Sequence, residues 1–444
     1  MIINPQLRAV DLQPKLDRFW KLSGDKIRRI EKRYDPSRGA PVFTARGRYT
    51  ARGWTEWTQG FQYGSAILQF DATGEQEFLE IGRQRTAQVM APHLTHFGVH
   101  DHGFNNVSTY GNLLRLMNEG RIAENAWERR FYELALKVSG AVQAKRWTDL
   151  GDHRGFIHSF NGPHSLFVDT IRSLRALALA HKLGQPLCEE NDLKIPLLAR
   201  LKAHATATAR YSVYYGEGRD SFDIRGRVVH EAIFNVKNGS FRCPSTQQGY
   251  SPFSTWTRGL AWAITGFAEE LEFLNWLGDR EITAELERAA RATCDFYIDQ
   301  GTAADGIPYW DTGAPGLDKL GDWRATQADP YNDYEPVDSS AAAIAAQGLM
   351  RLAHYLGKSG KRYHLAGLTV LDRLLDDPYL STQPAHEGLL LHSVYHRPNG
   401  WDYIPRGCKV PCGESSMWGD YHLREAALYA QRLAKREPYL TFFG

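Results

Sequence analysis

Apolar residues recur at helical spacing along almost the whole chain, and this pattern limits the fold more than any other feature. The spacing predicts roughly twelve helical stretches, which begin near residues 12, 56, 74, 103, 123, 165, 191, 253, 279, 337, 360 and 415. Strand signals are short and lie around Pro41–Ala51, Tyr211–Val229 and Gly388–Tyr395. The chain is therefore expected to be all-α, with a few short strands in its loops.

Two of the helical stretches carry clear end signals. The segment LFVDTIRSLRALALAHKLG predicts one helix that stops at Gly184. The segment SSAAAIAAQGLMRLAHYLG stops at Gly357 and follows Asp338, a good N-cap residue.

The number of helices predicts an (α/α)6 barrel, in which six inner helices are surrounded by six outer ones. Small residues at Gly60, Gly64, Ser65 and Ala341–Ala346 would let inner helices approach closely. An open helical solenoid is the alternative, but the chain contains no repeat of fixed length. No linker or low-complexity tract divides the sequence, so residues 1–444 are expected to form a single catalytic domain. The longest connections, 211–252 and 301–336, are candidates for functional loops.

Bulk properties exclude several kinds of partner and compartment. The formal net charge is only +2, which gives no reason to expect nucleic acid. No run of about 18 apolar residues predicts a membrane span, and no signal peptide is visible. Five cysteines without a CxxC motif are expected to be reduced thiols in a cytoplasmic protein. The oligomeric state is not predicted.

The segment from Val229 to Phe267 gathers polar residues that can hold an anionic sugar beside aromatic surfaces that can stack on one. Its candidate binding residues are His230, Gln248, Arg258 and Trp262. A structural ion pair is an equally common use of Arg258. Upstream, Trp57 could stack on a pyranose ring or simply pack.

Two aspartates are candidates for acid–base chemistry. Asp169 follows Leu166-Phe167-Val168 and is predicted to lie in an apolar helix, where burial would raise its pKa above about 3.9 and keep it protonated. A structural pairing of Asp169 with Arg172 or Arg175 is the alternative. Asp101 lies between two histidines and could instead be a helix N-terminal residue. Although His93, His96, His100 and His102 lie close in sequence, no ligand pattern completes a metal site, so neither metal nor cofactor is expected.

Nine segments, taken together and in order, resemble glycoside hydrolase family 88, the unsaturated glucuronyl hydrolases. The resemblance covers about residues 50–430. The segments are WTQGF (57–61), HDHGF (100–104), FVD (167–169), His230, QGY (248–250), WTRGLAW (256–262), PYWD (308–311), DSSAAAIAAQGL (338–349) and SSMWGDYHLREAAL (415–428).

The resemblance implies an (α/α)6 barrel that acts on oligosaccharides made by polysaccharide lyases. Such enzymes hydrate the C4=C5 double bond of the non-reducing-end unsaturated uronic acid and thereby release the remaining sugar. By motif position, Asp169 matches the general acid/base and Asp101 the second aspartate. The matched substrate-binding positions are Trp57, His100, His230, Gln248, Arg258 and Trp262.

Some parts of the chain depart from the family pattern. These are TIRSL after Asp169, His102, an insertion at 321–336 and the stretch KVPCGESSMWGD (409–420). A related hydrolase acting on unsaturated rhamnogalacturonides or saturated glucuronides therefore remains an alternative. More distant alternatives are another toroid enzyme, such as a sugar epimerase, and a non-catalytic sugar-binding or scaffold protein.

Overall fold

The protein's computed structural model describes residues 1–53 and 56–443, and its long helices are of two kinds. Outer helices bury one stripe: α1 (Gln13–Arg33), α3 (Gln76–Val89), α7 (Ala126–Lys145), α10 (Leu197–Tyr211), α12 (Thr283–Phe296) and α14 (Lys361–Leu374). Inner helices are buried almost all round: α2 (Gln59–Thr73), α5 (His102–Asn106) with η3 (Val107–Gly111) and α6 (Asn112–Asn118), α8 (Thr170–Ser173) with α9 (Arg175–Lys182), α11 (Thr257–Leu277), α13 (Ser339–Leu356) and α15 (Met417–Lys435). Helices that are apolar on every side are core helices.

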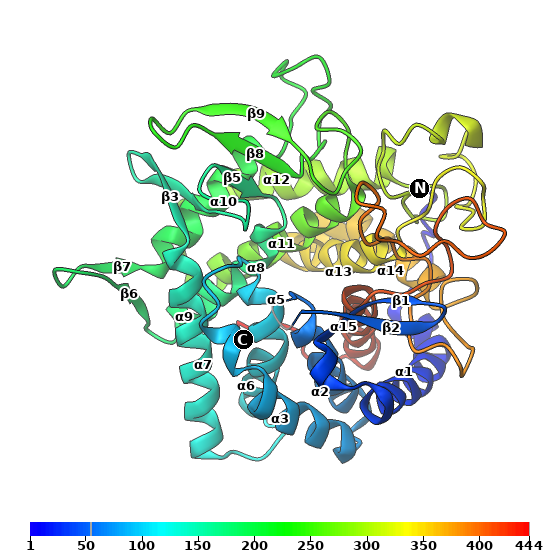
Figure 1. Ribbon diagram of the computed structural model, residues 1–444, viewed down its shortest axis with the longest axis horizontal. Helices are drawn as coiled ribbons and strands as arrows, with labels where there is room; N and C mark the ends of the chain where they lie inside the picture. The colour runs from blue at the N-terminus through cyan, green and yellow to red at the C-terminus, as the bar shows by residue number, and fades with distance from the viewer. Residues whose placement is uncertain (54–55, 444) are drawn as a thin grey trace.

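The inner helices form a closed ring (Figure 1). Along the chain, α2 contacts α5, α5 contacts α8, α8 contacts α11, α11 contacts α13 and α13 contacts α15; α15 then packs back onto α2. An open solenoid would leave its two ends apart. The predicted (α/α)6 barrel is therefore confirmed, and each of the twelve predicted helical stretches has its counterpart.

Glycines in α2 allow the close approach that the sequence predicted. A Cβ atom on Gly60 would lie 2.2 Å from the carbonyl oxygen of Asn105, and one on Gly64 would lie 2.5 Å from that of Ser108. Both distances are shorter than van der Waals contact, so a larger residue would push α2 away from the α5–η3 segment.

Short turns and hairpins complete the chain. The turns are η1 (Ala9–Leu12), η2 (Pro36–Arg38), α4 (Ala91–Leu94), η4 (Tyr297–Gly301), η5 (Leu317–Leu320) and η6 (Gly357–Gly360). The strands form antiparallel pairs β1 (Ala40–Ala45) with β2 (Arg48–Arg52), β3 (Trp147–Gly151) with β4 (Arg154–Ile157), and β6 (Pro186–Cys188) with β7 (Lys194–Pro196). A three-stranded antiparallel sheet has the order β5 (Ser165–Phe167), β8 (Glu231–Phe234), β9 (Phe241–Ser245).

The strand predictions were correct in one place and wrong in two. The hairpin at Pro41–Ala51 is confirmed. The segments Tyr211–Val229 and Gly388–Tyr395 hold isolated bridges, Val213 with Val228 and Leu380 with Leu390, but no regular strand among their described residues. Side chains such as Asp223, which accepts hydrogen bonds from three backbone amides, take the place of a strand ladder there.

The helix predicted across LFVDTIRSLRALALAHKLG is also shorter than expected. Residues 165–167 form β5, which pairs with β8, and the helix starts only at Thr170. A short apolar run does not distinguish a buried strand from a buried helix, and here pairing with β8 decides. Asp169 therefore lies at the strand-to-helix junction and not inside a helix. By contrast, Asp338 caps α13 as predicted, with its carboxylate accepting from the amides of Ser340 and Ala341.

Two further observations concern the sequence predictions on compartment. Among the described helices, none is long and apolar enough to cross a membrane. All five cysteines are free thiols, and the Sγ atoms of Cys408 and Cys412 lie 3.6 Å apart without a bond.

Candidate active site

The predicted site residues meet at the N-terminal ends of the inner helices. Trp57 precedes α2, Asp101 immediately precedes α5, Asp169 immediately precedes α8, and Arg258 lies in the first turn of α11. Helix N-termini carry partial positive charge and unpaired N–H groups. This end of the barrel is consequently favourable for an anionic ligand.

A cavity of about 220 Å³ lies at this end. Seven of the eight predicted residues line it: Trp57, His100, Asp101, Asp169, Gln248, Arg258 and Trp262. His230 does not line the cavity and lies behind its wall, with its ring against Phe167 and Trp256 at centroid distances of 4.3 and 4.8 Å. If the protein is an enzyme, both aspartates and Arg258 are expected to lie in one cavity. The structure places them together there.

His100 lies between the two aspartates. Its Nε2 atom is 3.2 Å from Asp169 Oδ1 and 3.7 Å from Asp101 Oδ1. The His100 side chain is only 2% exposed, and its Nδ1 atom has no hydrogen-bond partner among the residues that the structure describes. The three groups therefore form one buried acid–base unit, named here the Asp–His–Asp triad.

The pKa values of the two aspartates are shifted in opposite directions. Burial raises the pKa of Asp101, and this effect exceeds the opposing influence of His100. Burial also acts to raise the pKa of Asp169, but the hydrogen bond and positive charge of His100, with help from His230 and Arg258, outweigh it and lower this pKa. The prediction that burial keeps Asp169 protonated is thus wrong for the unliganded protein, in which the proton is held more firmly by Asp101.

Asp169 does not pair with Arg172 or Arg175, which was the structural alternative for this residue. Arg172 bonds Glu269 and, at 2.8 Å, Glu425, while Arg175 donates to the carbonyl oxygen of Gly103 at 3.0 Å. These arginines belong to a buried charge network deeper in the barrel. Asp169 is left with His100 as its hydrogen-bonding partner.

Arg258 is already bonded to several protein groups. Its Nη1 atom bonds Asp338 at 3.0 Å and the carbonyl oxygen of Val394, and its Nη2 atom donates to Gln248 Oε1 at 2.9 Å and to the carbonyl oxygen of Tyr395 at 2.7 Å. Only Nε has no partner among the described residues. The guanidinium therefore shapes the wall of the cavity and orients Gln248, besides placing positive charge there.

Gln248 is fixed from two sides. Because Arg258 holds its Oε1, its amide NH₂ is left to donate to a ligand. Behind it, His230 Nδ1 accepts from the backbone amides of Gln247 at 3.0 Å and Gln248 at 3.4 Å. Burial lowers the pKa of His230 to about 4, so its ring is neutral and carries its hydrogen on Nε2.

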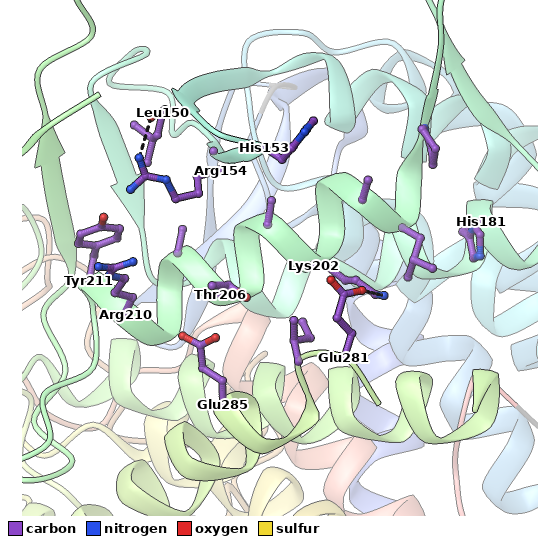
Figure 2. Close-up of a pocket in the computed structure, with 17 residues that line it drawn as sticks. Leu150, His153, Arg154, His181, Lys202, Thr206, Arg210, Tyr211, Glu281 and Glu285 are labelled. Atoms are coloured by element: carbon purple, nitrogen blue, oxygen red, sulfur yellow. Dashed lines mark hydrogen bonds and ion pairs between the residues drawn. The ribbon is translucent and has the colours of Figure 1, made fainter. Parts of the chain in front are cut away.

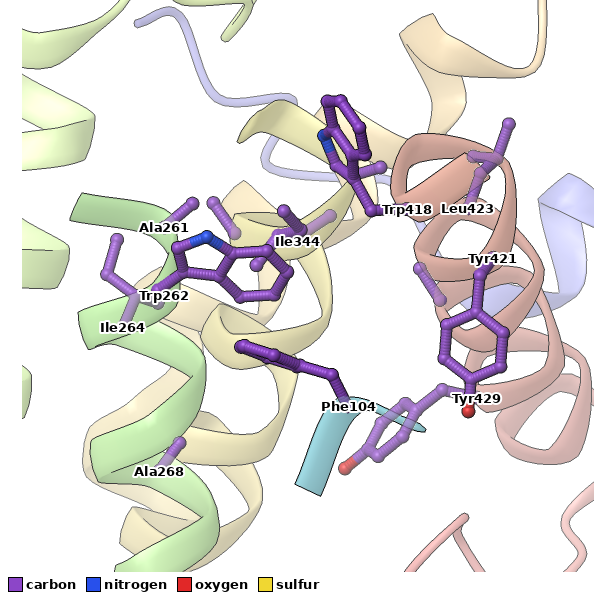
Figure 3. Packing of buried hydrophobic residues seen from close by; sticks show 14 of the residues in the cluster. Phe104, Ala261, Trp262, Ile264, Ala268, Ile344, Trp418, Tyr421, Leu423 and Tyr429 are labelled. Carbon is purple, nitrogen blue, oxygen red and sulfur yellow. The ribbon is translucent and has the colours of Figure 1, made fainter. Parts of the chain in front are cut away.

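Trp57 joins an aromatic cluster as well as the cavity wall. Its ring stacks on Trp418 at 5.0 Å and lies 5.6 Å from Phe104. Figure 3 shows Phe104, Trp262 and Trp418 converging from three inner segments of the barrel, with Phe104 and Trp262 4.9 Å apart. Trp57 thus packs on the core and also lines the cavity, and its stacking on a sugar ring stays a prediction.

The cavity is also lined by six residues that were not predicted as site residues: Glu56, Val99, Phe104, Phe160, Phe167 and Trp256. Glu56 precedes Trp57, and Phe160 precedes the β5 strand. Phe160 is 57% exposed and stacks on His100 at 6.1 Å. The acidic neighbour of Trp57 was a usable signal for the former, but the position of Phe160 depends on a loop fold that no motif specifies.

A second, larger hollow of about 530 Å³ lies outside the ring, between α10, α12 and the β3–β4 hairpin (Figure 2). Its polar groups largely satisfy one another, since Lys202 pairs with Glu281 at 2.6 Å and with Asp279. None of the predicted site residues lines it. Among the described residues, no group of three or more His, Cys, Asp or Glu side chains is arranged to hold a metal ion in either place.

Comparison with known proteins shows which enzymes the chain resembles. No family model matches the chain. The unsaturated glucuronyl hydrolase of Bacillus sp. (strain GL1) is 27% identical over 87% of this chain and 89% of its own length. Over most of its length the chain thus resembles the unsaturated glucuronyl hydrolases, glycoside hydrolase family 88. It is accordingly an enzyme, a glycoside hydrolase.

Other similar proteins extend the comparison. An unsaturated chondroitin disaccharide hydrolase of Streptococcus pyogenes serotype M1 is 25% identical over 84% of this chain and 81% of its own length. A solved unsaturated glucuronyl hydrolase specific for heparin superposes with a TM-score of 0.74 at 20% identity, covering 95% of this chain and 98% of its own. This structural likeness agrees with the closed ring of helices described above.

Proposed function

We propose that this protein hydrates the C4=C5 double bond of the unsaturated uronic acid at the non-reducing end of lyase-generated oligosaccharides. The main observation behind the proposal is the Asp–His–Asp triad. It lies in a cavity whose wall also presents the side-chain amide of Gln248. A vinyl ether needs a proton donor at C4 and a base for water at C5. One carboxyl group that gives up its proton and then takes one back can fill both roles, and a second, linked carboxyl group helps to set its pKa.

Asp169 is the proposed proton donor. Entry of the uronate places a negative charge near the triad and removes water from the cavity, and both changes favour the neutral form of Asp169. His100 links Asp169 to Asp101, whose pKa is raised by burial, and a proton can move among the three groups because they titrate as one unit. Asp101 becomes the carboxylate that faces the sugar hydroxyls.

The proposed reaction proceeds in two proton transfers. Asp169 gives its proton to C4, which leaves positive charge shared between C5 and the ring oxygen. Water then adds its oxygen to C5 while Asp169 takes back a proton. The resulting hemiketal opens and expels the remaining sugar as an alcohol, so that one water molecule is consumed for each bond broken.

The remaining residues of the cavity are proposed to bind the uronate. The free NH₂ of Gln248 is a donor for oxygen atoms of the sugar, and Trp57 and Trp262 offer apolar faces to its ring. His230 acts from behind the wall, where it holds the backbone amides of Gln247 and Gln248. Arg258 contributes its charge and holds Gln248, which agrees with its extensive bonding to protein acceptors.

An activity screen tests this function. Purified protein is incubated with unsaturated disaccharides from chondroitin, hyaluronan, heparin, gellan, xanthan and ulvan, and loss of the ultraviolet absorbance of the C4=C5 bond is followed. We expect at least one of these substrates to lose absorbance as free sugar appears. Hydrolysis of an intact saturated glucuronide, with no loss of absorbance from any unsaturated substrate, would contradict the proposal.

A further inference from the structure

Glu56 is a third carboxyl group on the cavity wall. It lies next to Trp57, immediately before α2, and is half-buried. The hydroxyl of Tyr395 donates a hydrogen bond to it. Tyr395 also offers its backbone carbonyl oxygen to Arg258 at 2.7 Å, so Glu56 belongs to the same wall as the cation of the site.

The charges around the cavity do not balance when every acid is ionised. Arg258 is neutralised by Asp338, which lies 3.0 Å away. His100 is shared between Asp101 and Asp169. Glu56 has Arg52 as its cationic neighbour, but that guanidinium stacks over Trp401 at 3.9 Å.

An anionic sugar entering such a cavity would meet uncompensated negative charge. Coulomb repulsion between unit charges a few ångströms apart amounts to several kcal/mol at an effective dielectric constant of about 20. Asp169 is already the neutral carboxyl group of the proposed reaction, so a second carboxyl group must be neutral if the charge of the sugar is to be offset.

Glu56 is well suited to be that neutral group. Burial raises its pKa to about 7; the charge of Asp101 adds to the rise, and Arg52 opposes it. A neutral carboxyl that accepts from Tyr395 still has its own O–H, which can donate to an oxygen of the sugar.

We propose that Glu56 is a substrate-binding residue that works in its neutral form, so that the cavity accepts the uronate only together with a proton. This inference rests on the proposed function and adds a selectivity element to it. The titratable and charged groups that face Glu56 are Arg52 on β2, Tyr395, Asp101 and His100 before α5, Asp169 before α8, and Arg258 on α11.

Steady-state kinetics separate this role from a structural one. With a required proton and a pKa of about 7, KM for an unsaturated disaccharide should rise about tenfold between about pH 6 and about pH 8. In Glu56→Gln, whose amide can donate but not ionise, KM should stay nearly constant over this range. The kcat value should follow the triad in both proteins, so the variant changes the pH profile of KM far more than that of kcat.

Two further variants complete the test. Tyr395→Phe removes the donor that favours ionised Glu56, so the rise in KM should move to higher pH. Glu190→Gln, at an exposed position away from the cavity, should match the unaltered enzyme. Thermal unfolding of each variant checks that the fold is intact.

The outcomes distinguish the inference from the proposed function. If the unaltered enzyme acts on an unsaturated disaccharide and Glu56→Gln shows the same tenfold rise in KM, another carboxyl carries the effect and the inference is wrong. If the unaltered enzyme acts on no unsaturated disaccharide, the proposed function itself fails.

Discussion

The Nε2 atom of His100 lies 3.2 Å from Asp169 Oδ1, close enough for one hydrogen bond to link a buried imidazole to the proposed proton donor. The same nitrogen is 3.7 Å from Asp101 Oδ1. Burial alone would lower the pKa of His100, but the two aspartates raise it above its usual value. The two aspartates therefore favour the protonated form of His100, and its charge in turn acts on both carboxyl groups.

Replacing His100 should change how activity depends on pH. In His100→Gln the positive charge beside Asp169 is lost, so the pKa of Asp169 rises. Because Asp169 must be protonated to act as the donor, the alkaline limb of kcat should move to higher pH, while the maximal rate falls as positioning is lost. The pH profile of kcat measures this shift, and the exposed His153 provides a control in His153→Gln. A limb that moves to lower pH would contradict the assignment.

Replacing Arg258 by lysine should weaken substrate binding. A single ammonium group cannot hold Gln248 and the carbonyl oxygens of residues 394 and 395 at once. Each hydrogen bond lost contributes about 0.5–1.5 kcal/mol, and a misplaced Gln248 should raise KM about tenfold or more. The matched control is Arg227→Lys at another buried arginine, which bonds Phe253 and Asp220 away from the cavity. An equal rise in KM in both variants would show that Arg258 acts through stability alone.

The buried charge network should be a stability element that is separate from catalysis. Arg172→Met removes the nearest cation of Glu269 and Glu425, although Arg175 and Arg351 stay within 4.0 Å of them. Breaking a buried pair typically costs about 3–5 kcal/mol. Denaturant unfolding measures the loss in the free energy of unfolding. Arg362→Met, which breaks a 46% exposed pair with Asp299, should cost less than about 1 kcal/mol. Similar losses in the two variants would contradict the distinction.

Much of the barrel could be predicted because its signals are local. The apolar spacing of each helix and the cap at Asp338 depend on neighbouring residues, and they agree with the structure. The prediction that Asp169 lies inside a helix was wrong. Residues 165–167 form β5 because they pair with a strand 60 to 70 residues further along the chain.

The chemistry of the site was less predictable, since it depends on distant contacts. Arg258 stood out as a cation, but its bonds to the backbone of residues 394 and 395 cannot be seen in the sequence near it. The lowered pKa of Asp169 likewise depends on the distance to His100, which is 69 positions earlier in the chain. Seven of the eight residues grouped by motif order line one cavity, whereas their protonation states required three-dimensional geometry.

An exposed aromatic ring at the cavity should contribute to binding without supporting the fold. Phe160 is 57% exposed and lies against His100. Phe160→Ala should raise KM for a disaccharide about two- to tenfold, the equivalent of about 0.5–1.5 kcal/mol of aromatic contact, with little change in the melting temperature. Phe97→Ala removes an equally exposed ring that does not line the cavity, and its KM should not change. If the two variants behave alike, Phe160 has no special part in binding.

The most direct test of the account is the rate at which Asp169→Asn removes the ultraviolet absorbance of an unsaturated disaccharide on which the unaltered enzyme acts. Asparagine has nearly the same shape but cannot give a proton to C4, so kcat should fall by about 10²- to 10⁴-fold. The thermal unfolding curve should be nearly unchanged, and Asp192→Asn, at an exposed position, should retain full activity. Full activity in a folded Asp169→Asn protein would contradict the central claim that Asp169 is the proton donor.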